Sequence, residues 1–384
     1  MAVSEEKTKR ILIFSIAYVP FVGGAELAVK EITDRLGGFH FDLITFHFDR
    51  KLPKIEKIGN VIAHRIKGTK LFFSFFAFLR GLALHKKYKY DVVWAIMANR
   101  AGFAALFFKT FHPEVKFLLT LQEGDPLDYP KKQMGLFWFF LKHLFKTIFT
   151  KADYIQTISN YLAVWARKMD YKGRLEIIPN GVDINLFKKN LDNIDKLRSK
   201  LEAPLSYIWL ITTSRLVEKN GIEDIIKALK YLDKKYKLFI LGTGPLEERL
   251  RRITKDLDLE DRVKFLGQKD HKDIPDYINV SKVFIRPSLS EGMGNSFIEA
   301  MAAGIPVIGT RVGGIPDFIK DGETGLFCEV NSPQSIAEKV TEYINNPKRT
   351  DKIVETAQKL VREKYDWDLI AEKMKNIFEK LLAR

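Results

Sequence analysis

The sequence predicts an α/β protein with doubly wound parallel sheets in two domains. The chain has 384 residues, which is too many for one compact core and enough for two ordinary domains. Short apolar runs suited to buried strands recur along both halves of the chain. Helical stretches separate most of these runs, and the alternation of strand and helix favours parallel sheets covered by helices.

The expected strands of the first half are six short apolar runs. They are residues 11–15, 41–46, 61–66, 92–95, 117–121 and 154–157. The turn-forming run from Ile177 to Asp183 then marks the exit from the first domain. Residues 190–202 are charged and poor in strand formers, so we expect a surface segment between the domains. In the second half, further strands are expected around residues 209–213, 238–241, 263–267, 282–286 and 306–308.

The composition is that of a soluble globular protein, with 46% hydrophobic and 29% charged residues. A single cysteine, Cys328, excludes an internal disulfide framework and suits a reducing compartment. No apolar run reaches about 18 residues and the first ten residues show no signal peptide, so we expect a cytoplasmic protein. A net charge of +15 suits anionic partners. Neither zinc-finger spacing nor an RNA-binding aromatic signature is present, so no nucleic-acid partner is expected.

Two segments of the first half combine large apolar side chains with lysines, at residues 70–89 and 135–151. Basic amphipathic helices of this kind can lie in the interface of an anionic bilayer. They can equally bury their apolar stripe on the sheet and expose the lysines to water. The sequence leaves both interpretations open. If the helices lie in the bilayer interface, the protein is peripheral on the inner face of the plasma membrane.

The stretch from Ser288 to Gly309 predicts a loop, a helix and a strand that follow the buried strand at 282–286. Gly292 and Gly294 allow a close approach of the backbone to a ligand, and Asn295 or Ser296 can cap the helix. Ligands of open parallel sheets bind beyond the carboxyl ends of the strands, where this loop lies. Its amides favour an anion. Two carboxylates, Glu291 on the loop and Glu299 in the helix, could hold hydroxyls at two points of one ligand.

This stretch resembles the donor-site signature of the retaining glycosyltransferases of family 4. The similar run is Glu291-Gly-Met-Gly followed by Glu299-Ala-Met-Ala-x-Gly-x-Pro-Val-Ile, with seven residues between the two glutamates. The resemblance covers nearly the whole chain. It implies the GT-B fold, in which two Rossmann-like domains face each other across a cleft. On this basis we expect domains at 1–184 and 185–367, with a final helix at 368–384 that packs back on the first.

The resemblance also implies roles for individual residues. Arg215, assisted by Lys219, would bind the donor diphosphate; Glu291 would meet the transferred sugar and Glu299 the ribose. The family's lysine often directly precedes the glycine at 221, where this chain has Asn220, so Lys219 is shifted by one position. The remaining donor-binding candidates share glycine-rich or helix-initiating loops. They are Gly24, Gly242, Gly244, Gly292, Met293, Gly294, Asn295 and Ser296.

The run Gln122-Glu123-Gly-Asp125 departs from the family, many of whose members carry a histidine here. Glu123 and Asp125 are our candidates for positioning the acceptor or stabilising positive charge on the sugar. Asp125-Pro126 could alternatively be a simple turn. Whether Gln122 or Glu123 takes over the function of the histidine is open from the sequence.

The expected reaction is transfer of a sugar, with retention, from a UDP- or GDP-sugar to a glycan or a polyprenyl- or other lipid-linked acceptor in cell-envelope or polysaccharide synthesis. No Asp-x-Asp motif is present, so we expect neither a metal ion nor another cofactor. Two alternatives remain: a nucleotide-sugar epimerase of the same fold, and a non-catalytic basic protein that binds membrane or nucleic acid. An epimerase would interconvert free nucleotide sugars without an acceptor, and absence of binding to a panel of nucleotide sugars would favour the non-catalytic protein.

Overall fold

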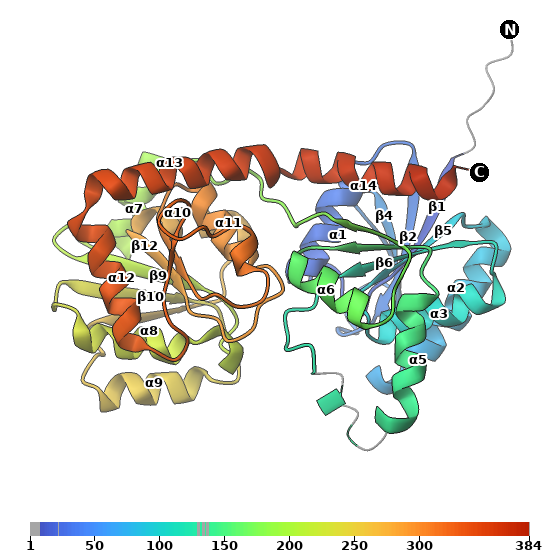
Figure 1. Ribbon diagram of the computed structural model, residues 1–384, viewed down its shortest axis with the longest axis horizontal. Coiled ribbons are helices and arrows are strands. Elements are labelled where there is room, and N and C mark those ends of the chain that lie inside the picture. Colours follow the sequence, from blue (N-terminus) through green and yellow to red (C-terminus); the bar gives the residue numbers. More distant parts are fainter. Residues whose placement is uncertain (1–7, 22, 129–130, 133–134, 136–137, 384) are drawn as a thin grey trace, which may run out of the picture. The chain divides into compact units, whose positions relative to one another are not determined.

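The computed structural model describes residues 8–21, 23–128, 131–132, 135 and 138–383 (Figure 1). These residues form two compact units. Unit 1 contains the described residues up to Asn180 and those from Trp367 onward, and unit 2 runs from Gly181 to Asp366. The division therefore lies inside the turn that the sequence marks as the exit from the first domain. Each unit is an α/β fold with its own sheet, and the predicted fold class is confirmed.

The sheet of unit 1 has eight strands in the order β3-β4-β2-β1-β5-β6-β7-β8. All neighbours are parallel except β3, which pairs antiparallel with β4 at one edge. The strands are β1 (Lys9–Phe14), β2 (Phe39–Phe46), β3 (Ile55–Ile58), β4 (Val61–Ile66), β5 (Val92–Ile96), β6 (Lys116–Leu121), β7 (Tyr154–Thr157) and β8 (Arg174–Ile177). The sequence missed β3 and β8, because both edge strands are partly exposed and lack the apolar run of a central strand.

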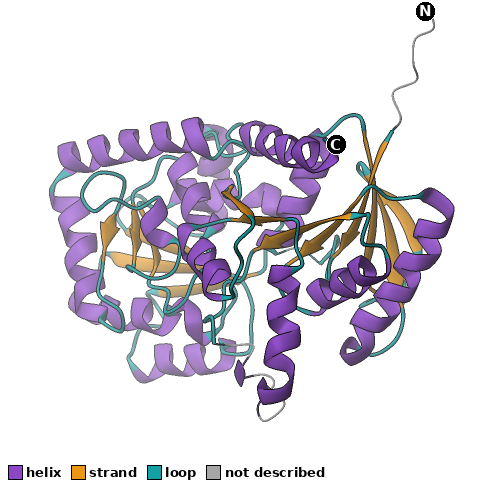
Figure 2. Cartoon of the chain, turned by 45° about the vertical axis from the view of Figure 1, so that its right-hand side comes forward, coloured by secondary structure: helices purple, strands orange, loops and turns teal. Residues whose placement is uncertain are grey.

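Helices cover both faces of this sheet (Figure 2). On one face lie α1 (Gly24–Arg35) and the last helix, α14 (Trp367–Leu382), whose apolar stripe packs into a core with Ile11, Ile13 and Trp94. On the other face, Gly81 lies against Leu12 and Phe14, and Phe108 contacts Phe14. This second layer contains α2 (Phe73–Tyr88), α3 (Arg100–Phe111) and α5 (Trp138–Thr150), and α6 (Asn160–Lys168) packs on α5.

The sheet of unit 2 has six parallel strands in the order β11-β10-β9-β12-β13-β14. They are β9 (Ile208–Thr213), β10 (Tyr236–Leu241), β11 (Val263–Gly267), β12 (Val283–Arg286), β13 (Val307–Gly309) and β14 (Leu326–Phe327). The helices are α7 (Leu191–Lys200), α8 (Ile222–Ala228), α9 (Glu247–Asp256), α10 (Ile274–Val280), α11 (Asn295–Ala302), α12 (Pro333–Asn345) and α13 (Pro347–Lys364). The loops after β9, β10 and β12 therefore share one edge of the sheet, as the sequence predicts for the candidate site.

The segment expected to lie between the domains is instead a helix of unit 2. Residues 191–200 form α7, which is capped by the Asn190 side chain and packs on α10. The sequence pattern was misleading because one buried side chain, Ile194, holds this charged helix to the unit. Cys328 follows β14 and is buried, and burial raises the pKa of its thiol to about 12, as suits a core residue.

Candidate functional site

The donor loop of unit 2, residues 287–294, connects β12 to α11. Gly294 precedes the first residue of α11 and has φ = 100°, a backbone conformation that glycine adopts readily. The helix begins at Asn295 and its cap residue is Gly294 without a side-chain cap, so the prediction that Asn295 or Ser296 caps the helix is wrong. Met293 and Ser296 are buried beside this helix terminus. The amides at the N-terminus of α11 thus meet the carboxyl edge of the sheet, where the sequence expects an anion.

Glu291 is held at the centre of the donor loop and is only 8% exposed. Its Oε1 accepts a hydrogen bond from the amide of Gly292 at 3.1 Å, and its Oε2 lies 2.6 Å from Nη2 of Arg286. This second contact is an ion pair without the alignment of a hydrogen bond, so Oε2 makes no hydrogen bond to any described residue. A buried carboxylate oxygen of this kind can still accept from a ligand hydroxyl.

Arg215 and Lys219 follow β9, the neighbour of β12 in the sheet. The side chain of Arg215 is exposed, and no residue in the described part of the chain forms an ion pair with it. Lys219 lies in a short 3-10 helix (Glu218–Asn220), and its carbonyl oxygen accepts from the amide of Leu289 at 2.7 Å. This backbone bond joins the phosphate-clamp candidates to the donor loop.

Gly242 and Gly244 follow β10 and support the loop that carries Arg215. A Cβ at Gly242, which has φ = 126°, would lie 1.9 Å from the carbonyl oxygen of Ser214. A Cβ at Gly244 would lie 2.5 Å from the carbonyl oxygen of Leu216. The two glycines therefore let two loops pack backbone to backbone. This close packing explains why glycine occupies both positions, whether or not the loop also lies beside the ligand as predicted.

Glu299 lies on α11, where its Oε1 is 3.0 Å from Nε2 of His271. His271 follows β11 and contacts the ring of Phe187. The carboxylate of Glu299 is 13% exposed, whereas the imidazole is 38% exposed. Glu299 lies about one turn into the helix that follows the donor loop, and its pair with His271 could hold a polar group of a ligand.

In unit 1, Gly24 is the first residue of α1 and is exposed. The Oε2 of Glu26 accepts from the amide of Gly23 at 2.8 Å. Burial raises the pKa of this carboxyl above its usual range. Glu26 therefore caps its own helix, and the amide of Gly23 already has an acceptor, which leaves the amides from Gly24 onward at the helix terminus.

The run from Gln122 to Asp125 follows β6 at the carboxyl edge of the unit 1 sheet. Gln122 is buried, and its Oε1 accepts from Nδ2 of Asn180 at 3.0 Å. The Oε1 of Glu123 accepts from the amide of Ala98, in the loop after β5, at 2.6 Å. Its Oε2 is buried and makes no hydrogen bond to a described residue. Burial and, to a smaller extent, the charge of Asp125 raise the pKa of Glu123 to about 7.

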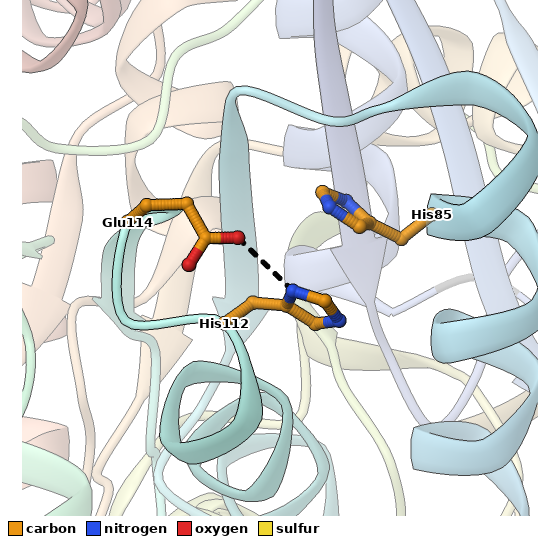
Figure 3. A group of neighbouring side chains, drawn as sticks. All are labelled: His85, His112 and Glu114. Carbon is orange, nitrogen blue, oxygen red and sulfur yellow. Dashed lines mark hydrogen bonds and ion pairs between the residues drawn. The ribbon is translucent and has the colours of Figure 1, made fainter.

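The described residues contain one group that could offer three metal ligands, His85, His112 and Glu114 (Figure 3). Nδ1 of His112 lies 3.0 Å from Oε1 of Glu114, and the ring centroids of His85 and His112 are 4.4 Å apart. Nδ1 of His85 accepts from the amide of Tyr90, so the neutral ring carries its proton on Nε2 and offers no free lone pair to a metal. The group also lies before β5 and β6, at the opposite edge of the sheet from Glu123.

Two residues that the sequence analysis did not single out, Arg286 and His271, contact its candidate glutamates. A signal existed for Arg286, because it is a cation at the carboxyl end of a buried strand. His271 had a weaker signal, since it is a polar residue shortly after the end of β11. The predicted residues of unit 2 are thus brought to one edge of one sheet, whereas Gly24, Glu123 and Asp125 belong to unit 1.

Comparison with known proteins agrees with this geometry. The family described as glycosyl transferases group 1 matches residues 193–360, and the one described as Glycosyltransferase Family 4 matches residues 22–186. An uncharacterized glycosyltransferase of Methanocaldococcus jannaschii is 26% identical over 97% of this chain and 98% of its own length. A GDP-mannose-dependent phosphatidylinositol monomannoside mannosyltransferase of Mycobacterium tuberculosis is 28% identical over 58% of this chain and 60% of its own.

Solved structures show the same fold. Sucrose-phosphate synthase of Thermosynechococcus elongatus superimposes with a TM-score of 0.85 at 24% identity, over 97% of this chain and 99% of its own. Anabaena HepE, solved with UDP and glucose, has a TM-score of 0.80 at 21% identity, over 97% of this chain and all of its own. With both halves matched by family models and the GT-B architecture in place, the chain belongs to the family 4 glycosyltransferases.

Proposed function

We propose that this glycosyltransferase moves a sugar from a UDP- or GDP-sugar to a glycan or lipid-linked acceptor, with retention of anomeric configuration and without a metal ion. One observation carries the proposal. Glu291 and Glu299 lie along a single loop and helix at the carboxyl edge of the sheet of unit 2, and the exposed Arg215 lies in the loop after the neighbouring strand β9. Carboxylates that can hold hydroxyls thus share an edge with a cation that can hold a diphosphate.

In this proposal each group acts on one part of the donor. Arg215, assisted by Lys219 and the amides at the start of α11, neutralises the charge that develops on the leaving diphosphate. Oε2 of Glu291 accepts from a hydroxyl of the sugar, and Glu299 with His271 holds the ribose. The bond from the anomeric carbon to the phosphate oxygen breaks as the acceptor oxygen bonds to the same face of that carbon. The acceptor proton passes to the leaving phosphate.

The relatives support the two donor classes and the two acceptor classes. HepE has been solved with UDP-glucose, and the mycobacterial relative uses GDP-mannose and a phosphatidylinositol glycoside. A putative teichuronic acid biosynthesis glycosyltransferase of Bacillus subtilis is 28% identical over 70% of this chain. These proteins are the basis for proposing a role in cell-envelope or polysaccharide synthesis.

The first experiment measures binding and hydrolysis of UDP-glucose, GDP-mannose and ADP-glucose by the wild type and by Glu299→Ala. We expect selective binding of one nucleotide, weakened by the substitution. Glu338→Ala is the matched control, because Glu338 is an exposed glutamate on α12, away from the carboxyl edge. Absence of binding to all three donors would contradict the proposal.

Stereochemistry and metal dependence need separate measurements. The anomeric configuration of the product, read by NMR with the acceptor identified, should equal that of the donor. Activity should survive EDTA, because the cations of the protein take the part that a metal ion takes elsewhere. Inversion at the anomeric carbon would refute retention, and recovery by a divalent ion after loss in EDTA would refute metal independence.

We also propose that unit 1 meets an anionic membrane on its cytoplasmic face through α2, α3 and α5. These neighbouring helices contain no acidic residue, whereas α2 carries three Lys or Arg residues and α3 and α5 carry two each. On the opposite face of the sheet, α1 and α14 carry both signs of charge. A layer of helices with cations only is complementary to anionic lipid.

Exposed apolar side chains lie on α2 and α5 in the halves that carry Arg80 and Lys142, whereas Lys86, Lys87 and Lys109 lie at the opposite ends of α2 and α3. Leu71 is 70% exposed, Phe72 56% and Phe139 70%, and further exposed residues are Phe75, Phe76, Leu79, Leu141 and Leu144. All lie in the first half of α2 or α5 or in the short helix before α2 (Lys70–Phe72). Helices between parallel strands start at the carboxyl edge, so this surface is at the same edge as Glu123. A lipid-linked acceptor bound at Glu123 would therefore lie close to the bilayer.

This membrane surface includes part of the predicted segment 135–151, of which residues 136–137 lie outside the described residues. The other segment, 70–89, buries Phe73 and Phe78 in the core and exposes Phe72, Phe75 and Phe76, which are the side chains that the proposed contact with the bilayer uses. Within the described chain, none of the helices combines the length and the apolar character needed to cross a bilayer. The proposed contact is thus interfacial.

Vesicle sedimentation tests the contact directly. We expect binding to phosphatidylcholine vesicles that contain phosphatidylglycerol and much weaker binding to phosphatidylcholine alone. The triple substitution of Phe72, Phe75 and Phe76 by serine should weaken binding at least about tenfold, which corresponds to a loss of about 1.4 kcal/mol. Leu369→Ser is the matched control, an exposed apolar residue on α14. Equal binding of wild type and triple variant would refute the membrane surface.

A further inference from the structure

Arg286 connects three parts of the donor site. It ends β12, where its Nη2 lies 2.6 Å from Oε2 of Glu291. The same nitrogen donates to Oδ1 of Asn220 at 3.0 Å, and Nη1 donates to Oγ of Ser296 at 2.9 Å. Asn220 in turn donates from Nδ2 to the carbonyl oxygen of Arg215 at 2.7 Å. One guanidinium therefore joins the donor loop, the start of α11 and the loop of Arg215.

Among the described residues, Arg286 forms an ion pair with one anion, Glu291. Its side chain is 13% exposed and that of Glu291 is 10% exposed, so both members of the pair are largely removed from water. Breaking such a pair by removing one member leaves an uncompensated buried charge. Asn220, also buried, supplies a neutral acceptor where a cation would repel the guanidinium.

We propose that Arg286, held by Asn220, is a positioning residue that orients the carboxylate of Glu291 toward the donor sugar. This inference rests on the proposed function, in which Glu291 contacts the sugar. Arg286 sets the position of Oε2, while the amide of Gly292 fixes Oε1. The carboxylate is thus held by groups on either side before any ligand arrives, and the sugar meets a preorganised acceptor.

The role of Asn220 follows from the same contacts. In the sequence, Asn220 looks like a loss of the family's lysine from the phosphate clamp. In the structure, it is the partner of a buried arginine that stands between the clamp and the sugar-binding glutamate. Arg286 and Asn220 therefore function as a pair, and substitution of either residue should act on the sugar rather than on the nucleotide.

The experiment compares Arg286→Met, Arg286→Lys and Asn220→Ala with the wild type, each also combined with Glu291→Gln. Hydrolysis of UDP-glucose, GDP-mannose and ADP-glucose gives kcat and KM, and calorimetry with UDP, GDP and ADP gives affinity for the nucleotide alone. We expect Arg286→Met to lower kcat roughly 10- to 100-fold, the range found when a group that orients a functional ligand is removed. Affinity for the nucleoside diphosphate should stay within about twofold, and Arg286→Lys should recover part of kcat.

The double variants support the inference in one outcome, and two outcomes overturn it. In the Glu291→Gln background, Arg286→Met should have little further effect, because residues that act through one another are not additive. Additive losses, or an equal loss of nucleoside diphosphate affinity in Arg286→Met and Asn220→Ala, would overturn the inference. Thermal unfolding shows which variants remain folded. If Arg286→Met does not fold, Asn220→Ala is the milder test, because it removes only one of the contacts of Arg286.

The same data separate this inference from the proposed function. If Glu291→Gln has no effect on donor turnover, the assignment of Glu291 to the sugar is wrong. If Glu291→Gln lowers turnover and all variants of Arg286 leave it unchanged, only the positioning role is wrong.

Discussion

Glu123 in unit 1 and Glu291 in unit 2 have nearly the same local structure and opposite electrostatic surroundings. Each follows a central parallel strand, β6 or β12, at the carboxyl edge of its sheet. In each, Oε1 accepts from a backbone amide, and Oε2 makes no hydrogen bond to any residue the structure describes. Glu291 has Arg286 beside it, whereas the charged neighbour of Glu123 is another carboxylate, Asp125.

We infer from this difference that a neighbouring cation, and not burial alone, determines the function of a buried carboxyl group. Burial without a cation raises the pKa of Glu123 to about 7, so this group exchanges a proton near neutral pH. Glu291 forms an ion pair with Arg286. We therefore expect Glu291 to accept from sugar hydroxyls beside a fixed cation, and Glu123 to act in a way that depends on pH.

The largest effect is expected from Glu291→Gln, which keeps the shape of the side chain and removes its charge. The amide leaves Arg286 without its compensating anion and gives the sugar a weaker acceptor. We expect a loss of about 100-fold in kcat/KM for donor hydrolysis. Glu338→Gln on α12 is the control. A loss below about threefold would show that the charge of Glu291 matters little to donor hydrolysis. The cation beside Glu291 would then not distinguish its function from that of Glu123.

The second-largest loss of turnover is expected from Asn220→Lys, which changes the surroundings of Arg286, the cation beside Glu291. The new ammonium would replace the acceptor of Arg286 and place a second cation beside the guanidinium. We expect a loss of about tenfold in turnover together with a lower thermal unfolding temperature. Asn220→Ala removes the acceptor without adding charge and should cost less. Unchanged turnover in Asn220→Lys would mean that the position tolerates the lysine of the wider family.

The outcome of the sequence analysis shows which parts of such a site are visible in a sequence. The family signature and the order of strands are local patterns, and they placed Arg215, Glu291 and Glu299 at one sheet edge. The edge strands β3 and β8 were missed because partly exposed strands lack a continuous apolar run. Residues 190–202 were misassigned because a single buried side chain decides the packing of α7.

The contacts of Arg286 and the burial of Glu123 could not be predicted, because they depend on residues far apart in sequence. Asn220 and Arg286 are 66 positions apart, and Ala98 and Glu123 are 25 apart. A sequence pattern gives the residue type at the edge of a sheet but not the side chain that faces it across the edge. The ion pair of Glu291 comes from such a contact, whereas the raised pKa of Glu123 comes mainly from its burial in the folded chain.

A moderate effect is expected from Glu123→Gln, and it should depend on pH. We propose that the carboxylate form of Glu123 accepts a hydrogen bond from the hydroxyl group of the sugar acceptor, so wild-type transfer should rise with pH through about 7 and level off above it. In Glu123→Gln this limb should disappear, with a loss of roughly 10-fold at pH 8. Glu114→Gln, at the opposite edge, should keep the wild-type profile. The same limb in Glu123→Gln would assign the titration to another group.

Stability gives an independent test of the same titration. The folded pKa of Glu123 lies above its usual value, so between the two the folded state binds more protons than the unfolded state. The free energy of unfolding should therefore fall as pH rises through this window, from about 4.5 to about 7. Glu123→Gln should lack this part of the fall, so its thermal unfolding temperature relative to the wild type should rise with pH. A constant difference would show that Glu123 titrates normally.

The smallest effect is expected from His271→Ala, which removes the partner of the third carboxylate, Glu299. Here a partner is present, as for Glu291, but the imidazole is 38% exposed, and partly solvated pairs contribute little. We expect KM for the donor to rise by no more than about threefold with kcat unchanged. His271→Gln, which keeps a donor within reach, should be closer to the wild type. A loss as large as that of Glu291→Gln would mean that His271 itself binds the donor. The exposure of His271 would then not explain why the pair with Glu299 differs from the pair of Glu291 and Arg286.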